Sequence, residues 1–503
     1  MAELTERPFP PGDYPLIVVG SGPGGLQASS ALRGYGIEHA VLSADEQPGG
    51  MFRRWPFFQR LLSWTKPYAP VARGTRPYER YDWNSLIPET DEHRAVMVGL
   101  MDGTSYFPSR PEMQAGLEAF VGRTALPVRF GCRWTATRRL DDGRFALETS
   151  DGEYTAGTLV FAVGVSEPWR PTSPGMELAA HYADTQPVEH YADRRIFIIG
   201  KQNSGFELAS GMLPWAKRIV IASPSPAKLS VNTHSLVGIR ARYVQPYEDH
   251  VLGGGVAILD ASIEGIARGG AGAAPFKVTT RRSTDSVEMV FEADDVIAAT
   301  GFVAPLLDLP DLGVTTFGQS RLPAQTPFWE SATVPGIFFA GTIGQGSAGL
   351  KKHGIPSNSG AVQGARYNAR VLAGHIARSR FGYVPDRPLV ARADVLELLL
   401  EELTLGPELW HQRAYLARVL SLDPADGIRD EGILPLAWFV DAGGPDAIAA
   451  TLETDGTGAV YPVIYLRRSG AVSEHPIEAH PLLDYRTEAA RRDLAAILAL
   501  VLA

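Results

Sequence analysis

Glycines at a fixed spacing near the start of the chain are the residues best suited to bind a phosphate. Gly20, Gly22 and Gly25 follow a short apolar run and precede a helical pattern of small residues, with Pro23 and Gly24 between them. In a strand-to-helix turn of this kind, the first glycine permits the tight turn, the second lets a pyrophosphate approach the backbone, and the last allows close packing of helix on strand. Backbone N–H groups at the helix N-terminus then bind the phosphates. The spacing predicts a site for a dinucleotide cofactor.

The strand after this helix brings the next candidate contacts. It covers residues 39–42 and should end in an acidic residue that binds the adenosine ribose, but Ser43 stands there and Asp45 lies just beyond. Gly50 and Met51 follow at another turn. The order of strand, glycine turn, helix, strand and paired glycines resembles the FAD-binding start of flavoproteins with two dinucleotide domains, and this resemblance implies FAD.

A second glycine turn follows an apolar strand over residues 195–199. Gly200, Asn203, Ser204 and Gly205 match the GxGxSGxE pattern of the same superfamily, with Gln202 in place of its second glycine. A side chain at that point pushes a pyrophosphate outward, while the other residues preserve the turn. We therefore predict a second cofactor site.

The strand over residues 218–223 bears on the identity of that cofactor. It ends without the acidic residue that binds a ribose 2′-hydroxyl, and Ser223 and Lys228 offer donors to a 2′-phosphate instead. This favours NADPH over NADH. Two such sites in one chain predict that NADPH reduces FAD by hydride transfer while the protein holds the two rings together.

Further stretches resemble class B flavin-dependent monooxygenases, particularly the N-hydroxylating branch, over residues 14–380. Thr300 and Gly301 end an apolar strand and resemble the hinge at which the chain returns to the FAD domain. Gly341 and Thr342 end a later apolar strand, and the resemblance places them at the flavin pyrophosphate and ribityl chain.

Residues 51–84 are unusually rich in aromatic and basic side chains, and we expect them to fold over the flavin ring. The alternative is a packed loop with solvated arginines. The stretches over residues 62–66 and 81–86 resemble parts of these monooxygenases. The resemblance places Thr65 beside the isoalloxazine. The adjacent Lys66, as a basic residue of the stretch expected over the flavin, is a candidate cofactor contact.

Within this branch, the chain looks most like amino-acid N-monooxygenases that oxidise L-aspartate to nitrosuccinate in bacterial antibiotic and other natural-product pathways. The resemblance implies a C4a-hydroperoxyflavin that oxidises a neutral amine, so no catalytic side chain is expected. The two carboxylates of aspartate require cationic partners. Arg281 or Arg282 and Arg429 are the candidates, with Thr65 as a neutral donor; the alternative for each arginine is a solvated turn residue.

Other functions remain open at this level. The chain fits an N-hydroxylase of another amine or a Baeyer–Villiger-type monooxygenase, an NADPH–flavin reductase or oxidase that releases hydrogen peroxide, or a flavoprotein that serves as a binding scaffold. Oxygen and a small amine or amino acid are the expected reactants. The C-terminal tail favours a homo-oligomer, with a dimer as the expectation.

Composition excludes several classes. A net charge of −9 argues against nucleic acid and anionic membranes as partners. The N-terminal segment has neither a basic nor an apolar signal region, which predicts a cytoplasmic protein. Cys132 is the only cysteine, so a dithiol redox pair and hence a disulfide-reductase activity are excluded, and no metal site is expected.

The elements that position these residues predict an α/β protein with two Rossmann-like dinucleotide-binding domains, for FAD and NADPH, and an additional C-terminal α+β module. A weak helical pattern predicts a helix over Val256–Ile266. The expected segments are residues 1–165 (FAD domain, first part), 166–295 (NADPH domain, with an insertion over about 229–277), 296–384 (FAD domain, second part) and 385–503 (a lid or oligomerisation module).

Overall fold

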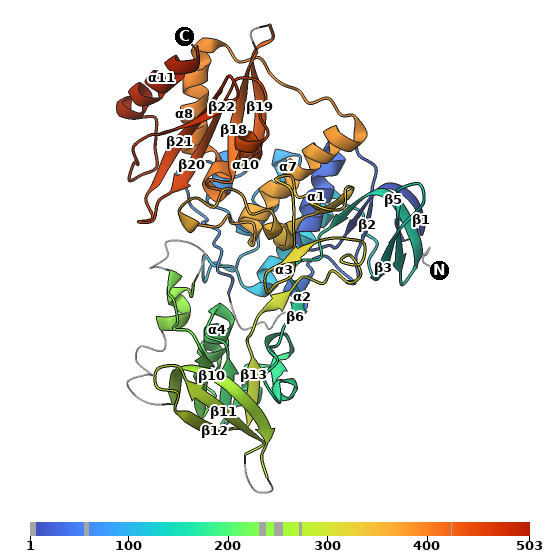
Figure 1. Ribbon diagram of the computed structural model, residues 1–503, viewed down its shortest axis with the longest axis vertical. Helices are drawn as coiled ribbons and strands as arrows, with labels where there is room; N and C mark the ends of the chain where they lie inside the picture. Colours follow the sequence, from blue (N-terminus) through green and yellow to red (C-terminus); the bar gives the residue numbers. More distant parts are fainter. Residues whose placement is uncertain are drawn as a thin grey trace. The chain divides into compact units, whose positions relative to one another are not determined.

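Two mainly parallel sheets, each in its own unit of the chain, organise the computed structural model (Figure 1). The structure describes residues 7–54, 60–230, 238–245, 255–270, 274–423 and 425–502. The first unit comprises Met1–Phe52, Ser63–Val165 and Ala304–Ala503, and the second comprises Arg53–Leu62 and Ser166–Val303. The chain thus returns to the first unit at Ala304 rather than at residue 296, because residues 295–303 still pair with strands of the second unit.

The sheet of the first unit has the strand order β2-β1-β5-β4-β3, with β17 also paired to β5. Strand β5 is long enough to join the parallel and the antiparallel parts of this sheet. Residues 152–156 pair antiparallel with β4, whereas residues 159–161 pair parallel with β17. The elements of this part are β1 (Gly12–Val19), α1 (Pro23–Gly34), β2 (Ala40–Leu42), α2 (Met51–Arg54), α3 (Arg110–Thr124), β3 (Trp134–Arg139), β4 (Phe145–Thr149), β5 (Gly152–Phe161), β15 (Thr316–Phe317), β16 (Leu322–Pro323), β17 (Ile337–Phe339) and α7 (Val362–Phe381).

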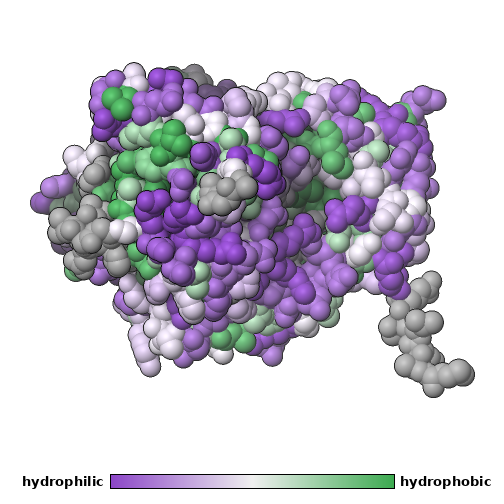
Figure 2. All heavy atoms as spheres, turned by 90° about the horizontal axis from the view of Figure 1, so that it is seen from below, coloured by the Kyte–Doolittle hydropathy of each residue, from purple (hydrophilic) through white to green (hydrophobic). Residues whose placement is uncertain are grey.

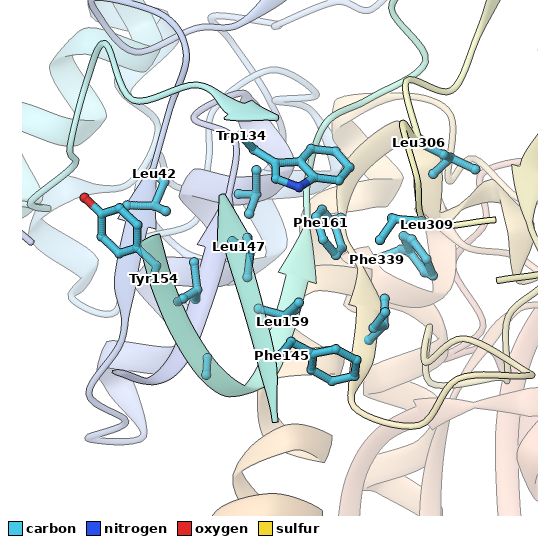
Figure 3. Packing of buried hydrophobic residues seen from close by; sticks show 14 of the residues in the cluster. Leu42, Trp134, Phe145, Leu147, Tyr154, Leu159, Phe161, Leu306, Leu309 and Phe339 are labelled. Carbon is cyan, nitrogen blue, oxygen red and sulfur yellow. The ribbon is translucent and has the colours of Figure 1, made fainter. Parts of the chain in front are cut away.

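An aromatic core holds these strands together (Figure 3). The rings of Trp134 and Phe161 lie 4.7 Å apart between centroids, and Phe339 of β17 lies 6.4 Å from Phe161. All three side chains are buried, and each contributes about 1.5–3 kcal/mol by leaving water. This core anchors the carboxyl ends of β1, β5 and β17 on a rigid base.

The second unit has a seven-stranded sheet in the order β12-β11-β10-β9-β8-β13-β7. The predicted helix over Val256–Ile266 is wrong: this segment lies in β10, which pairs parallel with β9 along its first half and antiparallel with β11 along its second. Pairing on both sides overrides a weak helical period. The elements are β6 (Glu167–Pro168), β7 (Ala180–His181), β8 (Arg195–Ile199), α4 (Asn203–Met212), β9 (Arg218–Ser223), β10 (Val256–Arg268), β11 (Phe276–Arg282), β12 (Glu288–Ala293), β13 (Asp295–Ala298) and β14 (Phe302–Val303).

The C-terminal module is an antiparallel sheet in the order β19-β18-β20-β21-β22. All eight residues of β20 are buried, because Ile448 packs with α8 and α11 on one face while Ala449 packs with Phe328 and Val371 of the first unit on the other. The module is therefore integral to that unit. Its elements are α8 (Val395–Leu405), α9 (Pro407–His411), β18 (Leu416–Asp423), β19 (Gly427–Pro435), α10 (Leu436–Asp441), β20 (Ala447–Thr454), β21 (Val460–Arg468), β22 (Ala471–Pro476) and α11 (Glu488–Leu502).

The visible surface is mostly hydrophilic. Figure 2 shows one face on which apolar residues gather only in separate patches. Within the described ranges, no helix combines the length and the apolar character needed to traverse a lipid bilayer.

Candidate functional site

The first glycine turn has the geometry of a phosphate-binding loop. Gly20 has a φ of +115° and its N–H donates to the Leu42 carbonyl at 2.8 Å, so the turn is tied to the end of β2. A Cβ at Gly25 would lie 2.0 Å from the Gly20 carbonyl oxygen, so only glycine fits there. A Cβ at Gly22 would meet nothing within 4 Å. Open space therefore faces Gly22 at the N-terminus of α1, where backbone N–H groups lack helical partners and favour an anion.

Two distant segments converge on this turn. A Cβ at Gly24 would lie 2.3 Å from the Cα of Gly341, and a Cβ at Gly50 would lie 3.3 Å from the Cα of Gly22. Thr342, half-buried, follows directly. The structure thus brings together three of the segments named from the sequence, at residues 20–25, 50–51 and 341–342. This cradle fits the pyrophosphate of FAD.

Two residues were expected to contact the adenosine ribose, Ser43 and Asp45, and the structure places them differently. The hydroxyl of Ser43 is buried, lies 2.7 Å from the Ser21 hydroxyl and accepts a hydrogen bond from the Asp45 N–H. Its oxygen is therefore engaged within the protein. Asp45, three residues beyond β2 and half-buried, carries the carboxylate nearest in sequence to this strand end.

The second turn repeats the first in its own unit. Gly200 has a φ of +114°, and its N–H donates to the Ala222 carbonyl at 2.8 Å. A Cβ at Gly205 would lie 2.0 Å from the Gly200 carbonyl oxygen, the same clearance as in the first turn. Gln202, exposed, precedes α4 at the position that Gly22 holds in the first turn. Because the second loop has a side chain at the position where the first has Gly22, a pyrophosphate fits the second loop with less close an approach.

Residues of the predicted insertion complete the second site. The Asn203 side chain accepts from the Arg240 N–H at 2.9 Å and donates to the Gly238 carbonyl at 2.9 Å. The Ile239 N–H donates to the Lys228 carbonyl. Asn203, Lys228 and Arg240 are thus held at the start of α4, and the Nε atom of Arg240 is buried without a hydrogen-bond partner. Sequence reasoning missed Arg240, because nothing in its local sequence marks it.

The residue after Gly200 forms an ion pair with strand β10. Lys201 has a side chain only 1% exposed, and its ammonium pairs with Asp260 of β10. Asp260 stands opposite Ser223 in the sheet register. The acidic residue missing from the end of β9 is therefore present on the neighbouring strand, where Lys201 neutralises it.

Thr65 is buried and its hydroxyl is already used. It donates to Asp82 at 2.8 Å and accepts from the Asn84 side chain at 3.0 Å. The structure thus gives Thr65 a role in fixing the loop over residues 63–87 rather than as a donor to substrate. Lys66 is exposed, and its ammonium lies 5.9 Å from the Tyr81 ring centroid.

Thr300 and Gly301 lie between β13 and β14 of the second unit. The Thr300 hydroxyl donates to the Trp169 carbonyl at 2.5 Å, and the Gly301 carbonyl lies 3.0 Å from Nε2 of His181. His181 is buried, and burial lowers its pKa. A neutral His181 therefore holds this segment in place.

The three arginines proposed as a substrate clamp are paired locally instead. Arg281, an exposed residue of β11, pairs with Glu264 and Glu288, both at 3.5 Å. Each of these guanidinium groups already has a carboxylate partner within its own unit, so none offers a free charge to a substrate in this structure. The other two pairs are Arg282 with Asp285 in the second unit and Arg429 with Asp426 in the first.

Cys132 belongs to the aromatic core of the first unit. It is 1% exposed, its sulfur lies 3.9 Å from the Tyr154 hydroxyl, and burial raises its pKa. A buried thiol with a raised pKa is a poor nucleophile. The chain therefore has no cysteine suited to exchange electrons with a disulfide.

Comparison with known proteins places these turns in a wider group. A family model described as pyridine nucleotide-disulphide oxidoreductase matches residues 17–341. FAD-dependent oxidoreductase domain-containing protein 2 of Mus musculus is 27% identical over 386 residues, which are 71% of this chain and 56% of that protein. The chain thus spans about half the length of this curated relative.

Two solved structures share the fold. A bacillithiol disulfide reductase from Staphylococcus aureus has a TM-score of 0.56 at 14% identity, and a flavin-containing monooxygenase from Stenotrophomonas maltophilia has a TM-score of 0.54 at 20% identity. Each alignment covers 73% of this chain and 99% of the other.

Proposed function

Because the chain belongs to the pyridine nucleotide-disulphide oxidoreductase family, whose members use FAD and NAD(P)H, we propose that it is an NADPH-dependent flavin monooxygenase. The observation that carries this proposal is that the chain has two dinucleotide turns of similar geometry but only one cysteine, which is buried. Electrons that pass from NADPH to FAD have no dithiol of this chain to reach, so a small diffusible acceptor must take them. Oxygen is that acceptor in the flavin-containing monooxygenase that shares the fold.

The residues of the two turns have distinct tasks in this proposal. The N-terminus of α1, with Gly22 and Gly50, holds the FAD pyrophosphate, and Gly341 closes the cradle from β17. Around the second turn, Arg240 supplies a cation to NADPH, with Lys228 as a second donor. FAD held in the first turn would supply the redox chemistry between NADPH and oxygen, and the two turns would orient the cofactors for it.

For the substrate, we propose the primary amine of a small amino acid, with L-aspartate oxidised to nitrosuccinate as the specific case in natural-product biosynthesis. The support is the resemblance of residues 62–66 and 81–86 to N-hydroxylating monooxygenases. The first oxidation converts amine, oxygen, NADPH and a proton to hydroxylamine, water and NADP⁺. The local pairing of Arg281, Arg282 and Arg429 favours a second candidate, an NADPH–flavin reductase or oxidase that needs no carboxylate clamp.

Product stoichiometry separates the two. Purified holoenzyme is supplied with NADPH, oxygen and each of a panel of amino acids and diamines, and NADPH consumption, hydrogen peroxide and product mass are measured together. A monooxygenase gives an amine-dependent rate and a product heavier by one oxygen atom or more. Hydrogen peroxide equal to the NADPH consumed with every amine would show a reductase or oxidase instead.

A further inference from the structure

Two arginines from distant parts of the first unit stack on one tryptophan. Arg80 ends a short helical turn over Arg76–Arg80, and Arg413 follows α9. Their guanidinium carbons lie 4.3 Å and 4.9 Å from the centroid of the Trp410 ring. The two charges are therefore no more than about 9 Å apart, the sum of these distances. All three residues are half-buried, so each keeps some contact with solvent.

Neither arginine has an acidic partner among the residues that the structure describes. Arg80 donates to the Thr404 carbonyl at 2.7 Å, and no carboxylate influences the pKa of either guanidinium. Burial, followed by repulsion from Arg80, lowers the pKa of Arg413 to about 10. Arg76, four residues earlier, shows the usual arrangement, because it pairs with both Glu402 and Glu408.

Uncompensated positive charge of this kind favours an anion. Two half-buried guanidinium groups that repel each other lose hydration without gaining a counter-charge. A guanidinium group presents a planar set of N–H donors that match a carboxylate in a bidentate arrangement. Stacking on an indole fixes the plane of each group and so reduces the entropy lost on binding.

This pair is connected to two parts of the first unit that we expect near FAD. One is the stretch over residues 51–84, and the other is the segment that follows Thr342. The Asn358 N–H donates to the side chain of Gln412 at 2.9 Å, and the Tyr415 hydroxyl donates to the Ser347 carbonyl at 2.8 Å. The chain on either side of Arg413 is thus bonded to the segment between Thr342 and α7. Arg80 directly precedes the stretch that contains Asp82, the partner of Thr65.

We propose that Arg80 and Arg413, stacked on Trp410, bind a carboxylate of the amino-acid substrate. The pair takes the role that sequence reasoning assigned to the arginines on the surface. This inference rests on the proposed function for the identity of the ligand as a substrate, and on the contacts above for the site itself.

The test uses succinate, a dicarboxylate without an amine, so that binding is measured without oxidation. Calorimetric titration of the holoenzyme compares wild type with Arg80→Gln, Arg413→Gln and Arg413→Lys. Arg268→Gln is the matched control, because Arg268 also stacks on a ring, that of Phe276 at 5.7 Å, but is exposed on β10. Urea unfolding and the flavin absorption spectrum of each variant report whether it is folded.

We expect succinate to bind the wild type and the Arg268→Gln control equally, and to bind both glutamine variants at least tenfold more weakly. Arg413→Lys, which keeps the charge, should recover part of the affinity. Equal binding by all folded variants, or no binding by the wild type, would overturn the proposal. Tighter binding of inorganic phosphate than of succinate would overturn the assignment to a carboxylate.

Substrate kinetics distinguish a failure of this inference from a failure of the proposed function. If the holoenzyme oxidises L-aspartate, the glutamine variants should raise its KM at least tenfold. If succinate binding depends on the arginines while no amine is oxidised, the anion site stands and the N-monooxygenase proposal falls.

Discussion

Replacing Gly22 by alanine should remove FAD binding while leaving the apoprotein folded. The backbone at Gly22 has a φ of −72° and a ψ of 177°, which alanine adopts without strain, and its Cβ would touch no protein atom within 4 Å. As the residue before α1, alanine is a poorer cap than glycine, at a cost of no more than about 1 kcal/mol. The new methyl group instead occupies the space proposed for the pyrophosphate.

For the neighbouring Gly25, we expect the alanine substitution to affect folding rather than ligand contacts. Its Cβ would lie 2.0 Å from a backbone oxygen of the same turn, which cannot move aside as a flexible side chain does. Strain of this kind costs about 1–3 kcal/mol. Gly25→Ala should therefore destabilise the apoprotein, whereas Gly22→Ala should cost ligand contacts. Loss of one hydrogen bond to a charged phosphate, about 1.5–3 kcal/mol, weakens FAD binding more than tenfold.

The assay combines two measurements on each variant. Apoprotein is titrated with FAD, followed by quenching of flavin fluorescence, and is unfolded in urea. Gly122→Ala in α3 is the control, because its Cβ also meets nothing within 4 Å and it lies on an exposed helix position away from the turn. Wild-type affinity for FAD in Gly22→Ala would show that the pyrophosphate does not lie in front of this residue. Unchanged apoprotein stability in Gly25→Ala would contradict the packing of the turn.

Four further substitutions test polar groups with buried partners. Thr65→Val removes a donor from Asp82, and we expect it to lower apoprotein stability by about 1–3 kcal/mol in urea while leaving the KM for substrate within twofold; a change confined to KM would restore Thr65 as a substrate contact. Asp260→Asn should destabilise the protein more than Lys201→Met. The first leaves the Lys201 ammonium, which is 1% exposed, without its counter-charge, whereas the second leaves the Asp260 carboxylate, which is 39% exposed and can be hydrated. Equal urea midpoints for the two variants would contradict this. Burial raises the pKa of Glu207 from 4.5 to about 7, so the contribution of this carboxyl to folding stability is greatest below pH 4.5 and falls by up to about 3 kcal/mol as the pH rises through 7. Glu207→Gln should flatten this decline in urea midpoints measured between pH 5 and pH 8, and parallel pH profiles would argue against a raised pKa.

The glycine turns show what local sequence can predict. A strand, a glycine spacing and a helix follow one another along the chain, so the turn is set by covalent neighbours. Gly20 and Gly200 have positive φ angles that glycine adopts readily, and Gly25 and Gly205 leave no room for a Cβ beside a backbone oxygen of the same turn. The helix over Val256–Ile266 failed for the opposite reason, because its strand pairs with partners far along the chain.

Contacts between distant segments escaped sequence reasoning. Arg240 is positioned by Asn203 across the insertion, and Gly24 fits against Gly341 although more than three hundred residues separate them. No periodicity or composition of either segment specifies its partner. Such contacts arise only when packing of apolar faces brings the segments together.

The sequence by itself determined the two dinucleotide turns, the α/β class and the absence of a dithiol, since these depend on residue types and on neighbours along the chain. Only the tertiary structure decided which arginines keep an unbalanced charge. Among the residues that the structure describes, Arg281 and Arg429 have nearby carboxylates and Arg80 and Arg413 have none, because the fold that surrounds a charged side chain selects its partner.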